Sequence, residues 1–272
     1  MSDNSSLGNR MKLYEAPTRA VLPRRSFCLL RVDGRSFHQY LRKADRPFDM
    51  NVIAIMDEVT KALCAEITGT VFAYTQSDEI SLLIEDFGSI HTQPWFGGVV
   101  NKMVSISAAL ASVKFNEVAH EIRTTSGFAP TGMALFDSRV FTISDPVEVA
   151  NYYVWRQKDW VRNSISMAAH AHFSQAELHK VNTDQMQEKL WQEKGINWAK
   201  YPDGLKRGRI CIKVAGEQEV TYTDRVSDET MTVDALRSWW EIQAAPHFTA
   251  NPDGWLAEVI PPMPSLAERR PA

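Results

Sequence analysis

Short apolar runs alternate with amphipathic segments along the first half of the chain, and this pattern predicts a mixed α/β fold. The run FCLLRVD at 27–33 ends in Asp-Gly, as a buried strand does where it enters a turn. Apolar residues at helical spacing follow Asp49, a good N-cap residue, and the helix is expected to stop at Gly69. Two further apolar runs, 70–74 and 79–85, flank a tight connection and predict a β-hairpin.

The next segments complete a recognisable order of elements. A second amphipathic helix is predicted to begin near Trp95, with apolar residues at helical spacing as far as Val113, and the run 133–143 predicts a fourth strand. The order β-α-β-β-α-β is that of a split βαβ, or ferredoxin-like, unit. The predicted fold class is therefore α+β, and in this topology the first and third strands are central, adjacent and antiparallel.

The second half of the chain has a mainly helical pattern. Asp145 is a good N-cap, and Pro146 suits the first helical position. A second helix is expected at about 160–173, Ser174 is expected to cap a short one, and 184–194 is amphipathic.

The remaining segments are predicted to be less regular. The sequence KRGRICIKV at 206–214 predicts an edge strand, and the acidic stretch after it shows no clear period. The proline-rich end at 260–272 is typical of a mobile tail. We expect a core with an N-terminal extension over 1–144, followed by a helical region with an irregular tail over 145–272; the two can form one continuous domain.

Composition excludes several classes of protein. The chain has 272 residues, a formal net charge of −3 and 44% hydrophobic residues, which excludes histone-like binders and wholesale disorder. It has no apolar run of about 18 residues and no apolar signal-peptide segment at its start. Its three cysteines, Cys28, Cys64 and Cys211, form no CxxC pair. We expect a reduced, cytoplasmic enzyme or binding protein without a membrane partner.

The mean charge conceals two basic blocks around an acidic segment. Residues 1–45 contain nine Lys or Arg against four Asp or Glu, and residues 156–213 contain eleven against six. Residues 46–100 contain two against eight. Ordinary scatter of surface charge is one interpretation. The other is that the basic blocks bind a polyanion and the acidic segment binds cations.

Carboxylates fall where the predicted topology brings strand ends together. Asp33 ends the first strand, whereas Asp78 and Glu79 begin the third, so these residues are expected at one edge of the sheet. Carboxylates that converge there suit Mg²⁺, and two such ions can support an in-line phosphoryl transfer. Gly34 would let its carbonyl approach a metal or a triphosphate closely. The alternative is that Asp-Gly and Ser-Asp are merely turn pairs.

Four segments together resemble the tRNA-His guanylyltransferase family and its 3′-to-5′ polymerase relatives: LRVDGRSFHQY, RPFD, AYTQSDEISLL and YYVWRQKDWVRNSIS. The resemblance runs from about residue 7 to residue 213. It implies a polymerase-palm-like catalytic core, two Mg²⁺ ions and nucleotide addition to the 5′ end of tRNA. It implies metal ligands at Asp33, Asp78 and the Gly34 carbonyl, with Glu79 as a catalytic carboxylate beside them.

The same resemblance implies residues that bind the nucleotide. Arg46 would contact the triphosphate, since a guanidinium binds phosphate through two parallel hydrogen bonds. Turn capping by Ser77, packing by His38 and simple solvation of Lys102 are the alternatives. The nucleotide-binding set is Arg35, Ser36, Phe37, His38, Arg46, Ser77 and Lys102.

The second basic block would contact the RNA by binding phosphates without reading sequence. Trp155 and Trp160 could stack on an end base, although core packing is the commoner role for such residues. His170 and His172 do not share a helix face, so we do not expect a metal site there. The RNA-binding set is Arg156, Lys158, Arg162, Asn163, Lys206, Arg207 and Arg209.

One departure from the family favours a particular branch. Eukaryotic members have His-Ile-Asn-Asn after WRQxD, and this is associated with untemplated guanosine addition; here the residues are Val161–Ser164. The sequence therefore favours template-dependent repair of tRNA 5′ ends, with ATP and GTP or other NTPs as substrates. The alternatives are addition of the extra guanosine to tRNA-His, a nucleotidyl cyclase-like enzyme, and a non-catalytic RNA-binding module. The family habit implies a homo-tetramer.

Overall fold

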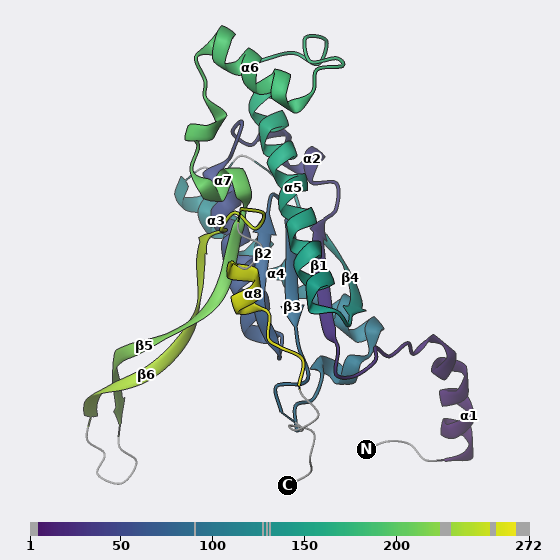
Figure 1. Ribbon diagram of the computed structural model, residues 1–272. Helices are drawn as coiled ribbons and strands as arrows, with labels where there is room; N and C mark the ends of the chain where they lie inside the picture. The colour runs from purple at the N-terminus through teal and green to yellow at the C-terminus, as the bar shows by residue number, and fades with distance from the viewer. Residues whose placement is uncertain are drawn as a thin grey trace.

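The computed structural model describes residues 5–89, 91–126, 128, 130, 132–223, 230–250 and 254–264. They form one antiparallel six-stranded sheet with helices on both faces (Figure 1). The strand order is β4-β1-β3-β2-β5-β6. The strands are β1 (Phe27–Gly34), β2 (Thr70–Gln76), β3 (Glu79–Ile84), β4 (Phe136–Ile143), β5 (Arg209–Thr223) and β6 (Thr230–Ala244).

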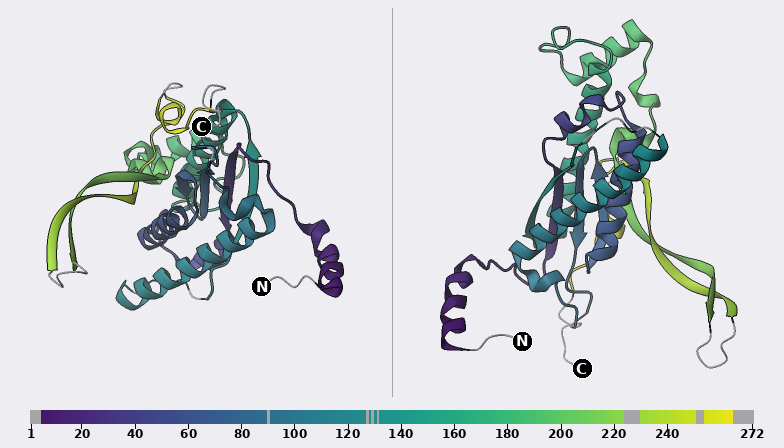
Figure 2. Two further views of the ribbon diagram at one scale, coloured as in Figure 1. Left: turned by 90° about the horizontal axis from the view of Figure 1, so that it is seen from below. Right: turned by 180° about the vertical axis from the view of Figure 1, so that it is seen from behind.

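Helices α3 and α4 cover one face of the sheet and α5 crosses the other (Figure 2). None of the helices in the described residues is long and apolar enough to span a bilayer. The α-helices are α1 (Ser6–Glu15), α2 (Phe37–Tyr40), α3 (Met50–Glu66), α4 (Val100–Ser126), α5 (Pro146–His170), α6 (Thr183–Lys194), α7 (Asp203–Arg207) and α8 (Trp255–Val259). Short 3-10 segments occupy Ala16–Thr18, Leu41–Lys43, Trp95–Gly98 and Trp198–Lys200.

The predicted β-α-β-β-α-β order is present from β1 to β4, and the α+β class is confirmed. Asp49 caps α3 as expected, because its carboxylate accepts from the backbone N–H groups of Asn51 and Val52. The helix predicted near Trp95 begins with a 3-10 turn, and α4 proper starts only at Val100, after Gly97 and Gly98 adopt positive φ. The strand prediction for 133–143 holds from Phe136 onward.

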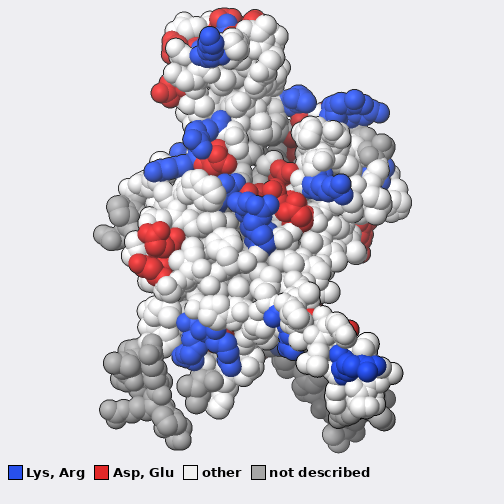
Figure 3. Space-filling model, turned by 90° about the vertical axis from the view of Figure 1, so that its right-hand side faces the viewer, with Lys and Arg blue, Asp and Glu red and all other residues white. Residues whose placement is uncertain are grey.

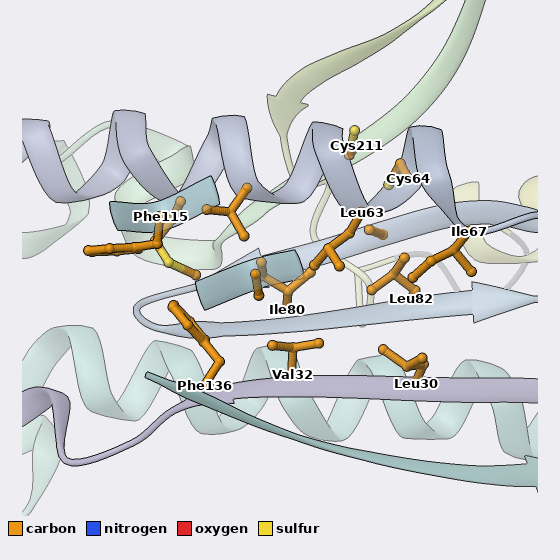
Figure 4. Packing of buried hydrophobic residues seen from close by; sticks show 14 of the residues in the cluster. Leu30, Val32, Leu63, Cys64, Ile67, Ile80, Leu82, Phe115, Phe136 and Cys211 are labelled. Atoms are coloured by element: carbon orange, nitrogen blue, oxygen red, sulfur yellow. The ribbon is translucent and has the colours of Figure 1, made fainter. Parts of the chain in front are cut away.

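Side chains alternate between two buried layers because successive strand residues point to opposite faces. On the α3–α4 side, strand residues such as Leu30 and Leu82 pack against Leu63 of α3 (Figure 4). On the other side, Phe27 and Phe72 pack with residues of α5. The central strands β1, β2 and β3 are therefore buried on both faces, and their ends are free to form a site.

The second half of the chain adds to the same sheet. β5 pairs with β2, and α5 packs its first turns on the strands of the first half, so residues on both sides of 144 share one core. Tyr74 of β2 donates a hydrogen bond from its hydroxyl to the Arg207 carbonyl, 2.8 Å away. Gly208 is required at this junction, since a Cβ there would lie 2.6 Å from the Tyr74 hydroxyl and its φ is +82°.

Three expectations about this half are wrong. Residues 146–170 form one helix, because neither Gly nor Pro interrupts the segment around Trp160. Residues 175–180 form turns rather than a helix. Residues 206–214 do not form an edge strand, because β5 is paired on both sides and β6 is the edge. Of the predicted mobile tail, 265–272 lie outside the described residues.

The stretch expected to be irregular continues β5 and forms β6, and the two strands project from the body as a long ribbon (Figure 1). Cross-strand pairs place side chains on two different faces. One face, which we call the apolar face, has Val214, Val220, Tyr222, Met231, Val233, Ala235 and Trp239, with Gln218 and Arg237 as its polar members. The polar face has Glu217, Glu219, Thr221, Thr232 and Asp234, with Leu236 and Trp240 as its large apolar members. Apolar and polar residues thus alternate along both strands, and many of them are Val or Thr, which favour strands. The acidic composition of this stretch had led us to expect an irregular segment.

Candidate active site

Two aspartates meet at one end of the central strands. β1 and β3 pair from Cys28 with Ile84 to Asp33 with Glu79, and the two-residue loop Ser77-Asp78 closes the β2–β3 hairpin. The Gly34 N–H donates to the Asp78 carbonyl, with N and O 3.0 Å apart. The register therefore brings Asp33 and Asp78 to the same sheet edge, where the predicted topology placed them.

The two carboxylates are not fully neutralised by their surroundings. Burial raises the pKa of Asp33, and the Glu79 and Asp137 carboxylates raise it further. Burial also raises the pKa of Asp78 to about 6, against the hydrogen bond from Ser77, and the Asp33 charge adds to the rise. Such a pair favours a cation between its members.

Glu79 has a different environment from Asp78, although the two are adjacent. Its carboxylate accepts from Arg156 Nε at 2.7 Å and from Arg156 Nη2 at 2.6 Å, and Arg31 Nε lies 3.8 Å away. Both Glu79 and Arg156 are buried. Glu79 forms this buried ion pair and does not line the pocket described below, so its catalytic role stays a prediction.

A pocket of about 920 Å³ opens at this edge of the sheet. Its volume falls within the usual range for small-molecule sites. Its walls are the loop 41–48, the start of α3, the C-terminal half of α5 and the strand ends that contain Asp33 and Asp78. On the face seen in Figure 3, acidic side chains gather in a hollow bordered by Lys and Arg.

Most of the predicted nucleotide-binding residues line this pocket: Ser36, Phe37, His38, Arg46 and Ser77. The loop that contains Arg46 is tethered, since the Asp45 N–H donates to Asp49 Oδ2 at 3.0 Å. Arg46 and His38 are exposed, which leaves their side chains available to an anion.

Phe37 and Gly34 have packing roles that the sequence did not suggest. The Phe37 ring is buried against Phe115 and Phe136, with centroids 5.2 and 5.0 Å away. A Cβ on Gly34 would lie 2.4 Å from that ring. The packing of Phe37 therefore requires glycine at 34, whatever the Gly34 carbonyl binds.

Two predicted nucleotide-binding residues lie outside the pocket. Arg35 is exposed beside it and does not line it. Lys102 is exposed in the first turn of α4, one residue from Met103, which packs near Cys28 and Ile84. Those two residues mark the opposite end of the β1–β3 pair, about 17 Å along the strands from Asp33. Lys102 therefore does not line this pocket, and its contact with the nucleotide stays a prediction.

Three of the predicted RNA-binding residues are buried and engaged inside the protein. Arg156 pairs with Glu79, and Lys206 Nζ donates to the Ala199 carbonyl at 2.7 Å. Arg209 Nε donates to Asp57 Oδ1 at 2.6 Å, and the residue lines the pocket. None of the three presents its charge on the outer surface, so the prediction that they hold RNA phosphates is revised.

The other predicted RNA contacts are more accessible. Lys158, Arg162 and Asn163 are exposed on α5, and Trp155 on the same helix is 52% exposed. Arg207 is partly exposed and pairs with Asp203. Trp160, by contrast, is buried and donates from Nε1 to the Leu205 carbonyl at 3.1 Å, which confirms the core role for that residue.

Several pocket residues had no sequence signal. Phe48 and Ile53 line the cavity from one stretch of the chain, and Met167 and His170 line it from the end of α5, more than 100 residues later. Of these four, only Phe48 belonged to a motif, RPFD. The sequence predicted two helices with a break near Trp160, whereas α5 is continuous to His170 and so reaches the pocket.

The donor set at the edge suits a hard cation. Mg²⁺ binds through one or two carboxylates and completes its octahedron with water and substrate phosphates. Asp33 and Asp78 supply two carboxylates, and Gly34 lines the same pocket. Clusters of three or more His, Cys, Asp or Glu positioned for a metal do not occur in the described ranges. A metal here would therefore depend on phosphate oxygens from a nucleotide.

Comparison with known proteins identifies relatives of this chain. The family model for tRNAHis guanylyltransferase matches residues 8–144. A bacterial tRNA(His) guanylyltransferase-like protein solved in complex with ATP is 36% identical, with 94% of this chain and 99% of that chain covered and a TM-score of 0.79. A structure of such a bacterial protein in complex with GTP has 35% identity, the same coverage and a TM-score of 0.73. An uncharacterized protein of Acanthamoeba polyphaga mimivirus is 29% identical over 84% of this chain and 82% of its own length.

The buried ion pair generates a stability prediction. Arg156→Met leaves the Glu79 carboxylate buried with the Gln76 amide at 3.2 Å and the Arg31 guanidinium at 3.8 Å, so the free energy of unfolding should fall by about 3 kcal/mol. Urea denaturation measures the change. The matched control is Arg162→Met on the same helix, because Arg162 is exposed and, among the described residues, pairs with Asp159 alone; it should cost less than about 0.5 kcal/mol. Equal effects would show that the ion pair does not secure α5.

Proposed function

The chain belongs to the tRNA-His guanylyltransferase family, whose members are nucleotidyltransferases, and we propose that it extends the 5′ end of tRNA in the 3′-to-5′ direction under the guidance of a template. The observation that carries this proposal is the convergence of Asp33 and Asp78 at a pocket that Arg46 and His38 also line. Carboxylates beside anion-binding groups are what phosphoryl transfer to a nucleotide requires.

The chain's own residues would position the reactants. Asp33 and Asp78 would hold two Mg²⁺ ions, which supply charge neutralisation and a lower pKa for the attacking hydroxyl. Arg46, His38 and Ser77 would bind the triphosphate oxygens. A 5′-monophosphate end is first activated by ATP with release of pyrophosphate, and the 3′-hydroxyl of the incoming NTP then displaces the activating AMP.

The proposal of templated addition rests on the segment after WRQxD. Ser164 occupies the last position of the tetrapeptide, is buried, and donates from its hydroxyl to the Val161 carbonyl at 2.9 Å. Only Asn163 offers an exposed amide. A site specialised for untemplated guanosine addition is therefore less well supported than templated repair, and guanosine addition to tRNA-His is the alternative.

The exposed face of α5 is the proposed RNA surface. Lys158 and Arg162 present positive charge, and Trp155 presents an aromatic ring for stacking. α5 also forms a wall of the pocket, so RNA held along this helix would have its 5′ end near Asp33 and Asp78.

We also propose that the chain self-associates through the apolar face of the β5–β6 ribbon. A two-stranded ribbon is at best marginally stable alone, and Tyr222, Met231 and Val233 on this face are exposed. The opposite face is acidic, which disfavours RNA as the occupant. α1 likewise has no buried residue in one chain and exposes Leu7 and Met11, so two copies could cover each other's unpartnered surfaces.

Asp78→Asn should abolish activity while the protein stays folded. A tRNA that carries a 5′-monophosphate and lacks its first nucleotide is incubated with labelled NTPs, ATP and Mg²⁺, and incorporation should fall about a thousandfold or more. Glu117→Gln, which changes an exposed carboxylate on α4 that does not line the pocket, is the control and should retain activity. Incorporation that follows the opposing base supports templated repair; guanosine regardless of that base supports the alternative.

The RNA surface predicts a change in salt dependence. Replacing Lys158 and Arg162 by Ala should reduce the slope of log affinity for tRNA against log salt by about 1 to 2, because two phosphate contacts are lost. Fluorescence anisotropy measures binding. Lys114→Ala, on α4 across the sheet, serves as the control. An unchanged slope in the double variant would place the RNA elsewhere.

The ribbon predicts face-specific effects on assembly. Val233→Glu should shift the protein toward monomers in sedimentation velocity, whereas Thr232→Glu, the same charge one residue away on the polar face, should not. A monomeric wild type, or equal effects of both substitutions, would refute self-association through the apolar face.

A further inference from the structure

Two arginines lie side by side next to the candidate active site. Arg31 of β1 and Arg139 of β4 are directly opposite each other in the strand register, and two residues further along the same strands Asp33 is opposite Asp137. Because alternate residues of a strand share a face, all four side chains are on one face of the sheet. The arginines are therefore about 7 Å along the strands from the aspartates.

The charges of these two guanidinium groups are only partly compensated by the described residues. Like charges opposite each other in a sheet are destabilising. Arg31 Nε is 3.8 Å from Glu79 Oε2, beyond hydrogen-bond distance, and that carboxylate is already bound by Arg156. Arg139 pairs with Asp137 at 3.3 Å, but both side chains are more than half exposed, and such a pair contributes little. An anion beside the two arginines would relieve their repulsion.

An exposed aromatic ring lies at the same level of the sheet. The Tyr152 hydroxyl of α5 is hydrogen-bonded to the Ser81 hydroxyl, 2.8 Å away, and Ser81 is opposite Arg31 in the β1–β3 pairing. Trp155, one helical turn closer to the site, is exposed, and its ring centroid is 5.9 Å from that of Tyr152. Guanidinium groups beside an exposed indole favour a nucleic acid over a small anion, because bases can stack on the ring while phosphates bind the cations.

The two arginines differ in what they can do for a ligand. The Arg139 side chain is 51% exposed and can contact a phosphate directly, whereas that of Arg31 is 15% exposed and acts mainly through its charge. Neither residue lines the 920 Å³ pocket, so a nucleotide bound there would leave both free. Lys and Arg side chains border the acidic hollow on the face seen in Figure 3.

We propose that Arg139, assisted by Arg31, binds the phosphate that follows the 5′-terminal nucleotide of the RNA. This inference rests on the proposed function, which places the 5′-terminal phosphate at Asp33 and Asp78. Neighbouring phosphates of a nucleic-acid strand are separated by a distance similar to that between these aspartates and the two arginines. The Arg139 guanidinium would bind the second phosphate through two parallel hydrogen bonds. Because the contact is to the backbone, it would hold the RNA end in position whatever its sequence.

A tRNA with one neutralised phosphate tests the proposal on the full chain. When the first internucleotide linkage is a methylphosphonate, only the phosphate assigned to Arg139 loses its charge. With Mg²⁺ present, wild type should bind this tRNA about tenfold more weakly than unmodified tRNA, because one charge-assisted contact is lost. Fluorescence anisotropy measures both affinities. This comparison needs no variant, so it is decisive even if Arg139 is needed for folding.

Variants then assign the effect to the side chain. Arg139→Gln should bind unmodified tRNA about tenfold more weakly than wild type does, and it should bind the modified and unmodified tRNAs equally. Its affinity for ATP should be unchanged, because Arg139 does not line the pocket. Lys114→Gln, on α4 across the sheet, is the matched control and should distinguish the two tRNAs as wild type does. Circular dichroism confirms that each variant is folded.

Three outcomes would overturn the inference. They are equal affinity of wild type for the two tRNAs, a folded Arg139→Gln that still distinguishes them, and a loss of ATP affinity in that variant as large as its loss of tRNA affinity. A wild type that binds no tRNA would instead contradict the proposed function itself.

Discussion

The ion pair between Glu79 and Arg156 is the interaction on which the site depends. It joins the start of β3 to the middle of α5 and is buried on both sides, so α5 is held across the sheet at one angle. One turn further along, Trp160 anchors the helix to α7, and the last two turns then overhang the sheet edge as a pocket wall. Loss of the pair would release that wall, since a buried charge without its partner is strongly unfavourable.

Two adjacent carboxylates of the β2–β3 hairpin, Asp78 and Glu79, have different environments. Glu79 begins β3 and points under α5, where a guanidinium neutralises it. Asp78 sits in the two-residue loop, where burial and Asp33 raise its pKa to about 6. The strand register enforces this proximity of like charges, because slipping β1 against β3 would turn every core residue to the wrong face. The site thus holds an electrostatic cost that a bound cation would relieve.

Beyond the core, two elements bury little surface against the part of the chain that the structure describes. The apolar face of the β5–β6 ribbon and α1 both project from the body (Figure 1). A two-stranded ribbon and a ten-residue helix are at best marginally stable in isolation. The self-association proposed above would cover both of these surfaces.

Local signals in the sequence determined the elements of the first half of the chain and the position of the paired aspartates. The Asp49 cap, the apolar runs of β1 and β3 and the Ser77-Asp78 turn act over a few residues, and the split βαβ order then places Asp33 beside Asp78. The tertiary structure determined which basic side chains are exposed and which are buried in ion pairs or hydrogen bonds. Arg156 and Arg209 are in the same basic block as Lys158 and Arg162, yet their partners Glu79 and Asp57 come from segments that no spacing rule brings near them. Burial and long-range pairing are properties of the packed chain, and they separate a buried guanidinium from an exposed one.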